Sequence, residues 1–402
     1  MRNAKIVCTL GPATAERSTI ADLAEAGMSI ARLNASHGTV EERRSLLGKV
    51  RSVEREVQRP IGTMLDLRGP EIRTAEPAGP VRLEVGDEVR FARGDTVDPP
   101  IIGLTVDLQD VETGTRILLD DGRIETVVAT VEEDYLVATV KSGGTFEGRS
   151  GVNVPGVRLG VDVVTPADEA DLDLAAEGEV DFIAASFVAD ADDVLAVGEA
   201  LERRGVDIPI IAKVELDAAR RNIDEIIDAS YGVMIARGDL GVECPLEEVP
   251  MIQKQLIRRC HHAGVPVITA TEMLDSMVHS SRPTRAEASD VANAVLDGTD
   301  AVMLSGETAI GDRPVATVQT MVRIIRTTEA SEEYDDLLEQ RVPRADRSNI
   351  DALARSARYL ARDLGAQAIV VASESGFTAL KVAKFRPGVP IVAVTPDESV
   401  RR

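Results

Sequence analysis

Residues Pro209 to Gly241 read PIIAKVELDAARRNIDEIIDASYGVMIARGDLG, and this stretch decides the fold. It contains two short apolar, β-branched runs, Ile210–Val214 and Gly232–Ala236, which are typical of buried parallel strands. Between them, Asp217 to Asp228 has the apolar spacing of a helix. We therefore predict a strand, helix, strand unit, with polar residues gathered where its strands end.

These strand ends carry charged side chains. Lys213 and Glu215 lie at the end of the first run, and Arg237 and Asp239 follow the second. In parallel α/β folds the carboxyl ends of the strands carry the chemistry. Two carboxylates without a neighbouring His or Cys favour a hard divalent cation, Mg²⁺ or Mn²⁺, with open positions for substrate oxygens. For Lys213 and Glu215 alone, a structural ion pair is the alternative interpretation.

The same alternation of strands and helices extends over most of the chain. Apolar runs predict strands at residues 4–10, 29–33 and 61–65, and again at 182–185, 210–214, 233–236, 265–270 and 301–304. Segments with helical periodicity separate these runs. Eight such units predict a (β/α)₈ TIM barrel built from residues 1–69 and 156–330, which would be the catalytic domain.

Two segments depart from this alternation. Residues 70–155 hold short alternating runs between Gly and Asp turns, which predicts an inserted all-β lid domain. Residues 331–402 begin with a polar linker or connecting helix and continue with two helices and two strands. Because two strands are too few to bury both faces of a parallel sheet, we expect a partial C-terminal α/β domain.

The composition narrows the class of protein. Lys plus Arg is 45 and Asp plus Glu is 68, a net charge of -23, so we expect no nucleic-acid partner. The sequence has no apolar run of about 18 residues and no leader-like start, and its three cysteines lack metal-ligand spacing. We therefore expect a soluble cytoplasmic protein with no membrane partner.

Further polar residues follow the other predicted strands. They are Arg32, Asn34, Ser36 and His37 after the second strand, Asp66, Arg68, Glu71 and Arg73 after the third, Ser186 and Phe187 after the fourth, Thr271 and Glu272 after the seventh, and Ser305 and Glu307 after the eighth. Taken singly, Asn34, Ser36 or Thr271 is more often a turn or helix cap. Taken together, oxygen ligands with the guanidiniums of Arg32, Arg73 and Arg237 indicate a metal-dependent enzyme acting on a small phosphorylated acid.

In these motifs the chain resembles the pyruvate kinase family. The resemblance rests on Ala4–Pro12, Arg32–Gly38, Gly69–Thr74, Lys213–Glu215, Ala236–Glu243, Ala270–Leu274 and Met303–Thr308, with Leu119–Gly122 and Gly151–Gly156 in the insertion. These motifs occur in family order along the whole chain. The resemblance implies phosphoryl transfer from phosphoenolpyruvate to ADP, giving pyruvate and ATP, with the β lobe closing over the nucleotide.

The resemblance also implies residue roles. Its catalytic residues would be Lys213, Thr271, Arg32 and Arg73, and its substrate-binding residues Arg32, Lys213, Gly238, Asp239, Thr271 and Ser305. Glu215 and Asp239 would ligate Mg²⁺, or Mn²⁺ in its place, while Asn34, Ser36, Asp66 and the backbone oxygen of Leu67 would bind K⁺. The nucleotide would meet Pro12, Asn34, His37 and Arg73.

The chain departs from the family pattern in places. Leu67 and Arg68 replace a common Thr-Lys pair, and Glu272 stands where glutamine is usual. Glu71 is the residue type that accompanies K⁺ dependence in the family, whereas a lysine there accompanies independence, and the pair of Leu67 and Glu71 gives mixed signals.

Two other functions stay open from the residues. A barrel lyase or aldolase of pyruvate enolates could use the same Lys, Glu, Asp and Mg²⁺ without a nucleotide, although it would not need a β lid. An inactive scaffold is the third alternative, which the intact Lys213, Glu215, Asp239 and Thr271 disfavour. The family implies a homo-oligomer, either a tetramer or a dimer.

Overall fold

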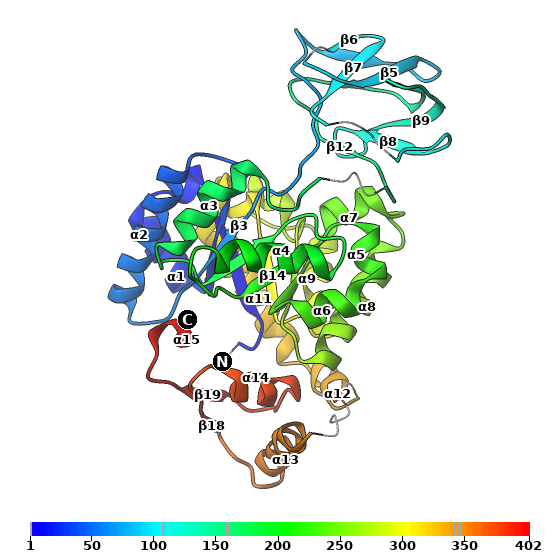
Figure 1. Ribbon diagram of the computed structural model, residues 1–402. Helices are drawn as coiled ribbons and strands as arrows, with labels where there is room; N and C mark the ends of the chain where they lie inside the picture. Colours follow the sequence, from blue (N-terminus) through cyan, green and yellow to red (C-terminus); the bar gives the residue numbers. More distant parts are fainter. Residues whose placement is uncertain are drawn as a thin grey trace.

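The computed structural model describes residues 2–95, 97–106, 108, 110–157, 161–340, 342–343 and 348–402. Figure 1 shows a central barrel, a β lobe beyond one of its ends and a small α/β unit beyond the other. The chain leaves the barrel for the β lobe after β3 and returns before α3, while the α/β unit follows the last barrel helix.

Eight parallel strands close the predicted barrel. They are β1 (Lys5–Leu10), β2 (Ile30–Asn34), β3 (Gly62–Asp66), β13 (Phe182–Ala185), β14 (Ile210–Val214), β15 (Gly232–Ala236), β16 (Val267–Ala270) and β17 (Ala301–Leu304). The order around the barrel is β1, β17, β16, β15, β14, β13, β3 and β2, and pairing of β2 with β1, for example Arg32 with Thr9, closes it. The TIM barrel prediction is therefore confirmed.

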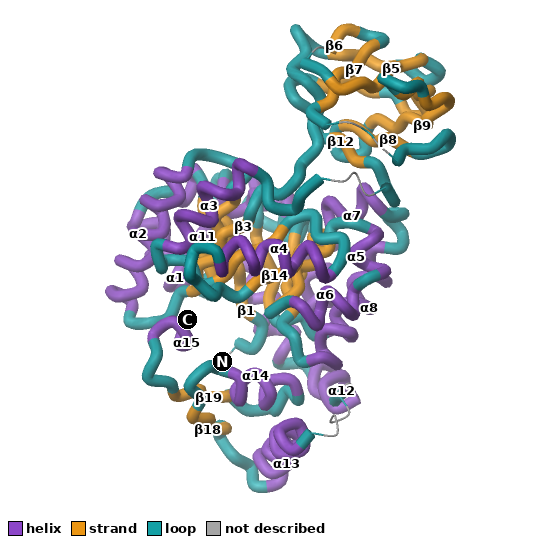
Figure 2. Tube along the Cα trace, in the orientation of Figure 1, coloured by secondary structure: helices purple, strands orange, loops and turns teal. Residues whose placement is uncertain are grey.

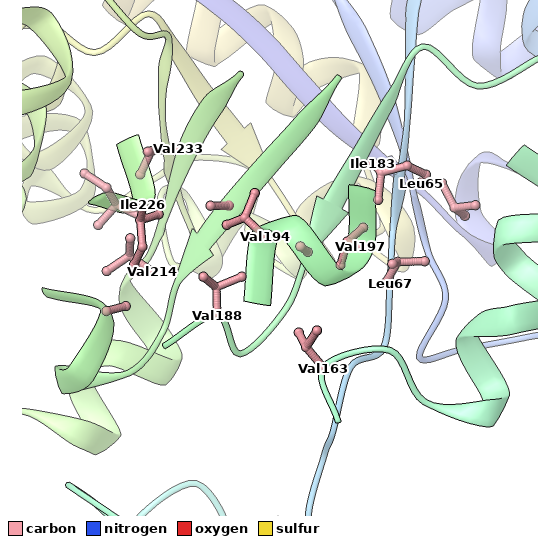
Figure 3. Packing of buried hydrophobic residues seen from close by; sticks show 14 of the residues in the cluster. Leu65, Leu67, Val163, Ile183, Val188, Val194, Val197, Val214, Ile226 and Val233 are labelled. Atoms are coloured by element: carbon pink, nitrogen blue, oxygen red, sulfur yellow. The ribbon is translucent and has the colours of Figure 1, made fainter. Parts of the chain in front are cut away.

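Helices surround the barrel on its outside (Figures 1 and 2). They are α1 (Arg17–Ala26), α2 (Val40–Val57), α3 (Pro166–Ala176), α4 (Ala191–Glu202), α6 (Ile223–Ala229), α8 (Val249–Ala263), α9 (Arg285–Asp297) and α11 (Pro314–Glu329). Several begin at a Thr whose side chain accepts a backbone N–H three residues later, as at Thr39, Thr165 and Thr284. Apolar residues of strands and helices then bury one another, as Figure 3 shows for Ile183 of β13 and Val197 of α4.

Two local predictions were incomplete. The helix expected over Asp217 to Asp228 is two helices, α5 (Asp217–Arg221) and α6, because Asn222 between them leaves helical geometry and donates its side-chain amide to Ala189 O. A short helix, α7 (Arg237–Glu243), begins directly after β15 and was not predicted. It places Asp239 in a first helical turn.

The inserted lobe is all β, as predicted. Its strands are β4 (Val81–Leu83), β5 (Glu88–Arg93), β6 (Val97–Asp98), β7 (Ile101–Leu104), β8 (Arg116–Leu119), β9 (Ile124–Val131), β10 (Leu136–Ser142), β11 (Gly144–Phe146) and β12 (Val152–Asn153). Seven of them form one sheet in the order β12, β8, β9, β10, β5, β7, β6. The lobe has its own apolar cluster around Phe91 and Phe146. The domain boundaries at residues 69/70, 155/156 and 330/331 stay a prediction.

The C-terminal segment forms an α/β unit. It contains α12 (Glu332–Gln340), α13 (Asn349–Asp363), β18 (Ile369–Ala372), α14 (Phe377–Lys384), β19 (Ile391–Val394) and α15 (Glu398–Arg401), with β18 and β19 paired in parallel. The buried Lys384 ammonium lies 2.7 Å from Asp351, and Arg386 lies 2.9 Å from Asp300 of the barrel. Within the described part of the chain, no helix has the length and apolarity needed to span a membrane.

Candidate active site

The carboxyl ends of β3, β13 and β14 meet at Lys213. Its ammonium lies 2.8 Å from Glu215 Oε1 and 3.2 Å from Asp66 Oδ1, and it donates a 2.6 Å hydrogen bond to Ser186 Oγ. Burial alone would lower the pKa of Lys213, but the carboxylates of Asp66 and Glu215 raise it above its usual range. Lys213 is therefore a permanently charged ammonium at the end of the barrel.

Next to this ammonium lie the buried carboxyl of Glu215 and the half-buried carboxyl of Asp239. Burial, with a smaller contribution from Asp239, raises the pKa of Glu215 to about 7 against the opposing effect of Lys213. Burial likewise raises the pKa of Asp239 above its usual range. Two such neighbouring acids indicate a place where more positive charge would be stabilising.

This donor set fits a divalent cation. In the described ranges, no three His, Cys, Asp or Glu side chains are grouped as metal ligands, so the protein would supply two carboxylates. Oxygen ligands suit Mg²⁺ and Mn²⁺, and Mg²⁺ commonly combines one or two carboxylates with substrate oxygens. The predicted roles of Glu215 and Asp239 are compatible with this arrangement and stay a prediction.

Asp66 links Lys213 to a second buried cation, Arg32. Arg32 Nε lies 2.6 Å from Asp66 Oδ2, and Arg32 Nη1 donates to Thr9 Oγ1 at 2.8 Å. Burial alone would raise the pKa of Asp66, but Lys213 and Arg32 lower it below its usual value. Asp66 is thus a permanent anion that fixes two cations at the barrel mouth.

The residues predicted to bind K⁺ lie beside Asp66. Asn34 is opposite Asp66 in the pairing of β2 with β3. Asn34 Oδ1 accepts the Ser36 N–H at 3.1 Å, which is the turn geometry considered as the alternative for these residues. The Leu67 backbone oxygen accepts a 2.7 Å hydrogen bond from Ser186 Oγ. The structure brings these oxygens to one region, and their binding of K⁺ stays a prediction.

Thr271 is held in an unusual backbone conformation. Thr271 and Glu272 both have positive φ, 65° and 53°, and for a β-branched residue such as Thr271 this geometry is strained. The Thr271 hydroxyl accepts the Gly238 N–H at 2.8 Å, which ties the end of β16 to α7. Two residues predicted to bind substrate, Gly238 and Thr271, therefore lie in direct contact.

Arg237 does not join the cationic group at the barrel mouth, contrary to expectation. Its guanidinium lies 2.6 Å from Asp290 of α9 and donates to the backbone oxygens of Thr271 at 2.7 Å and Ala270 at 3.2 Å. These contacts stabilise the strained turn after β16. Arg237 is therefore a support for Thr271, which strand-end position alone could not reveal.

The hydroxyl oxygen of Ser305, next to β17, is buried and has no hydrogen-bond partner in the described structure. Its backbone N–H donates to the buried Glu307 carboxylate at 2.6 Å. A buried hydroxyl without a partner is costly, which fits a group that would bind substrate or water.

Of the residues predicted to bind the nucleotide, Asn34 and His37 are in contact, since the His37 N–H donates to the Asn34 backbone oxygen at 3.4 Å. Arg73 lies in residues 67–80, the segment that leads from β3 into the lid and is called the lid strap here. There it pairs with Glu71 at 2.5 Å and donates to Arg149 O at 2.8 Å. Pro12 begins a short 3₁₀ turn after β1, and His37 is exposed after β2. The contacts described for Arg73 lie on the lid strap and do not include Lys213.

Two further residues of the site, Ser186 and Phe187, were predicted only as residues that follow the fourth strand. Ser186 bonds to Lys213, and the Phe187 N–H donates to Glu215 Oε2 at 2.6 Å. Their position after β13 was the available signal, because β13 lies between the strands that carry Asp66 and Lys213. The sequence motif alone did not give them a role.

The lid rests on the far end of α7. A side-chain carbon at Gly122 of the lid would lie 3.5 Å from Val242, and the Glu243 carboxyl bonds with the Asn153 side chain and the Gly156 N–H. Burial raises the pKa of Glu243 to about 7, more than these two hydrogen bonds lower it. Asp239 and this lid contact belong to the same short helix.

The Glu243→Gln variant is expected to be more stable than the wild type at pH 8 by up to about 3 kcal/mol. Because folding raises the pKa of Glu243, ionisation works against folding as the pH rises through the range between the unfolded and folded values. The difference should therefore shrink at pH 5, as urea unfolding at both pH values would measure. Glu247→Gln, at an exposed neighbouring position, is the control. A difference independent of pH would contradict the assignment.

Comparison with known proteins adds independent information. The family model for the pyruvate kinase barrel domain matches residues 1–318, and that for the pyruvate kinase alpha/beta domain matches residues 351–402. A pyruvate kinase of Geobacillus stearothermophilus is 47% identical over 408 residues, which cover 100% of this chain and 70% of that protein. A pyruvate kinase of Bacillus licheniformis is 46% identical with the same coverage. A crystal structure of a pyruvate kinase from Cryptosporidium parvum superposes with a TM-score of 0.95 at 36% identity, covering 99% of this chain and 84% of that one.

Proposed function

Since this chain belongs to the pyruvate kinase family of enzymes, we propose that it transfers the phosphoryl group of phosphoenolpyruvate to ADP, giving pyruvate and ATP. The observation that carries the proposal is the position of Lys213. Its ammonium is buried between Asp66 and Glu215 at the barrel mouth, where developing negative charge would be stabilised.

In this reaction the bond between phosphorus and the enol oxygen breaks, and a bond from phosphorus to a β-phosphate oxygen of ADP forms. Lys213 and Arg32 are the fixed cations that would stabilise charge on the transferring group and on the enolate left behind. The enolate then takes a proton at carbon to become pyruvate, and Thr271 would lie beside that carbon. Arg237 would hold Thr271 in place through its backbone oxygen.

Glu215 and Asp239 would hold Mg²⁺ or Mn²⁺, which would neutralise charge on substrate oxygens when bound. Asn34, Ser36, Asp66 and the Leu67 oxygen would hold K⁺. The nucleotide would lie between the lid and the region of Pro12, Asn34, His37 and Arg73. We also propose a homo-oligomeric, cytoplasmic enzyme, in keeping with the family.

A lactate-dehydrogenase-coupled assay tests the reaction. Purified protein with phosphoenolpyruvate, ADP and Mg²⁺ should release pyruvate, and omission of ADP should abolish the release. Omission of K⁺ should lower the rate. Pyruvate formation without ADP would favour the lyase alternative, and no pyruvate under any condition would favour the scaffold.

Divalent-cation binding should depend on pH through Glu215. Below its pKa of about 7 the carboxyl is protonated and cannot ligate, so Mn²⁺ affinity should fall by about tenfold per pH unit below pH 7. Electron paramagnetic resonance titration of Mn²⁺ without substrate would measure this. Glu215→Gln should bind weakly at every pH. Equal Mn²⁺ affinity of the wild type at pH 6 and pH 8 would contradict the role of Glu215.

A further inference from the structure

Ser186 directly follows β13, the barrel strand between the strand that leads to Asp66 and Leu67 and the strand that carries Lys213. β13, which ends just before Ser186, pairs with β3 on one side and β14 on the other. β3 leads to Asp66 and Leu67, and β14 carries Lys213. The backbone connection between β3 and β14 therefore runs through β13, and Asp66 also meets Lys213 directly, at 3.2 Å.

The Ser186 hydroxyl makes this connection directly. Its Oγ lies 2.6 Å from Lys213 Nζ, 2.7 Å from the Leu67 oxygen and 3.3 Å from Asp66 Oδ1. A hydroxyl has one hydrogen, so it accepts from the ammonium and donates to Leu67, its closest acceptor. Lys213 thereby uses its three N–H groups on Glu215, Asp66 and Ser186, which fixes the direction of the ammonium.

The backbone around Ser186 is also fixed. The next residue, Phe187, has a positive φ of 56° and donates its N–H to Glu215 Oε2 at 2.6 Å. From the other side, Gly69 has a φ of 67°, and a side-chain carbon there would lie 3.0 Å from Ser186 Cβ. The turn is held between the lid strap and Glu215. Ser186 therefore has little freedom to move with Leu67 alone or with Lys213 alone.

We infer that Ser186 is a positioning residue that couples occupancy of the monovalent-cation site to the placement of Lys213. This inference rests on the proposed function and the predicted K⁺ site. The Leu67 oxygen has two lone pairs, one of which accepts from Ser186 and one of which is available to a cation. A cation that orders Leu67 would order the Ser186 hydroxyl and, through it, the ammonium.

Ser186→Ala removes the hydroxyl and should lower kcat by about 10- to 100-fold, because a small misplacement of a catalytic group has effects of this size. The KM for phosphoenolpyruvate should change much less. The K⁺ concentration for half-maximal activation should rise several-fold. Ser186→Cys, which is nearly isosteric but a weak hydrogen-bonding group, should behave like Ser186→Ala. Ser230→Ala, which removes a hydroxyl bonded to Ile226 O after α6, should leave all three parameters unchanged.

A second readout needs no catalysis. K⁺, compared with tetramethylammonium at equal ionic strength, should raise the unfolding temperature of the wild type, and Ser186→Ala should need several-fold more K⁺ for half of that shift. A loss of kcat with an unchanged K⁺ midpoint in both experiments would overturn the coupling, as would a wild type that does not respond to K⁺. Failure of the proposed function would look different, since the wild type would lack ADP-dependent activity while the K⁺ shift could still be measured.

Discussion

Lys213→Met is expected to lower kcat by at least about a thousandfold, because it removes the ammonium from the point where charge develops. Methionine has a similar length and can fill the same buried volume without charge. The barrel should therefore remain folded, as circular dichroism would show. The coupled assay at high enzyme concentration would measure the residual rate.

The same substitution also tests the electrostatics of the site. Without the ammonium, Asp66 keeps Arg32 as a partner, whereas Glu215 keeps only the Phe187 N–H among the contacts described for it. Breaking such a buried pair costs about 3–5 kcal/mol when the remaining charge stays ionised. Because Glu215 can become protonated, the loss of stability should be smaller at pH 6 than at pH 8.

Lys254→Met is the matched control. Lys254 forms a 2.6 Å ion pair with Asp297 between α8 and α9, outside the site. This variant should keep the wild-type kcat. A Lys213→Met enzyme with more than a tenth of the wild-type kcat would contradict the central role of Lys213.

The barrel could be predicted because each of its strands is a continuous apolar run, and such runs are recognisable without knowledge of their partners. Short lid strands such as β6, β7, β11 and β12 could not be predicted individually, for the opposite reason. They have two to four residues, too few to show alternation, and depend on pairing with distant strands. In the site, strand-end position correctly gathered Asp66, Lys213 and Glu215 in one place.

The direction in which a side chain points could not be predicted from its position at a strand end. Arg32 and Arg237 both follow apolar strand residues, but Arg32 turns to Asp66 at the mouth and Arg237 turns to Asp290. The difference depends on which acid the fold brings near, and that acid lies 34 residues away in one case and 53 in the other. Ser186 likewise acquires its contacts only when β3, β13 and β14 are side by side.

Asp66→Asn is expected to lower both stability and activity, since Asn keeps the shape of Asp66 and removes its charge. Asp66 is fully buried and accepts from Arg32 and Lys213. An Asn has one acceptor oxygen, so its amide group would face one of the two cations. We expect about 3–5 kcal/mol lower unfolding free energy and about 100-fold or greater loss of kcat/KM for phosphoenolpyruvate.

The pH dependence of this loss has a definite sign. Folding lowers the pKa of Asp66, so its contribution to stability is present above the unfolded pKa and is lost as the pH falls through the lower folded value. The gap between wild type and Asp66→Asn should therefore be largest near neutral pH and narrow in acid. Urea unfolding at pH 7 and at a pH below 3 would measure it.

Asp181→Asn separates a structural effect from a functional one. Asp181 immediately precedes β13 at the opposite end of the barrel, where it lies 2.6 Å from Arg51 and accepts the Thr63 N–H at 2.8 Å. It is thus a buried, paired aspartate on the same pair of strands but away from the mouth. Asp181→Asn should cost stability and leave kcat and the K⁺ midpoint unchanged, whereas Asp66→Asn should change all three. Equal kcat in the two variants would mean that Asp66 acts only in folding and would contradict its role at the barrel mouth.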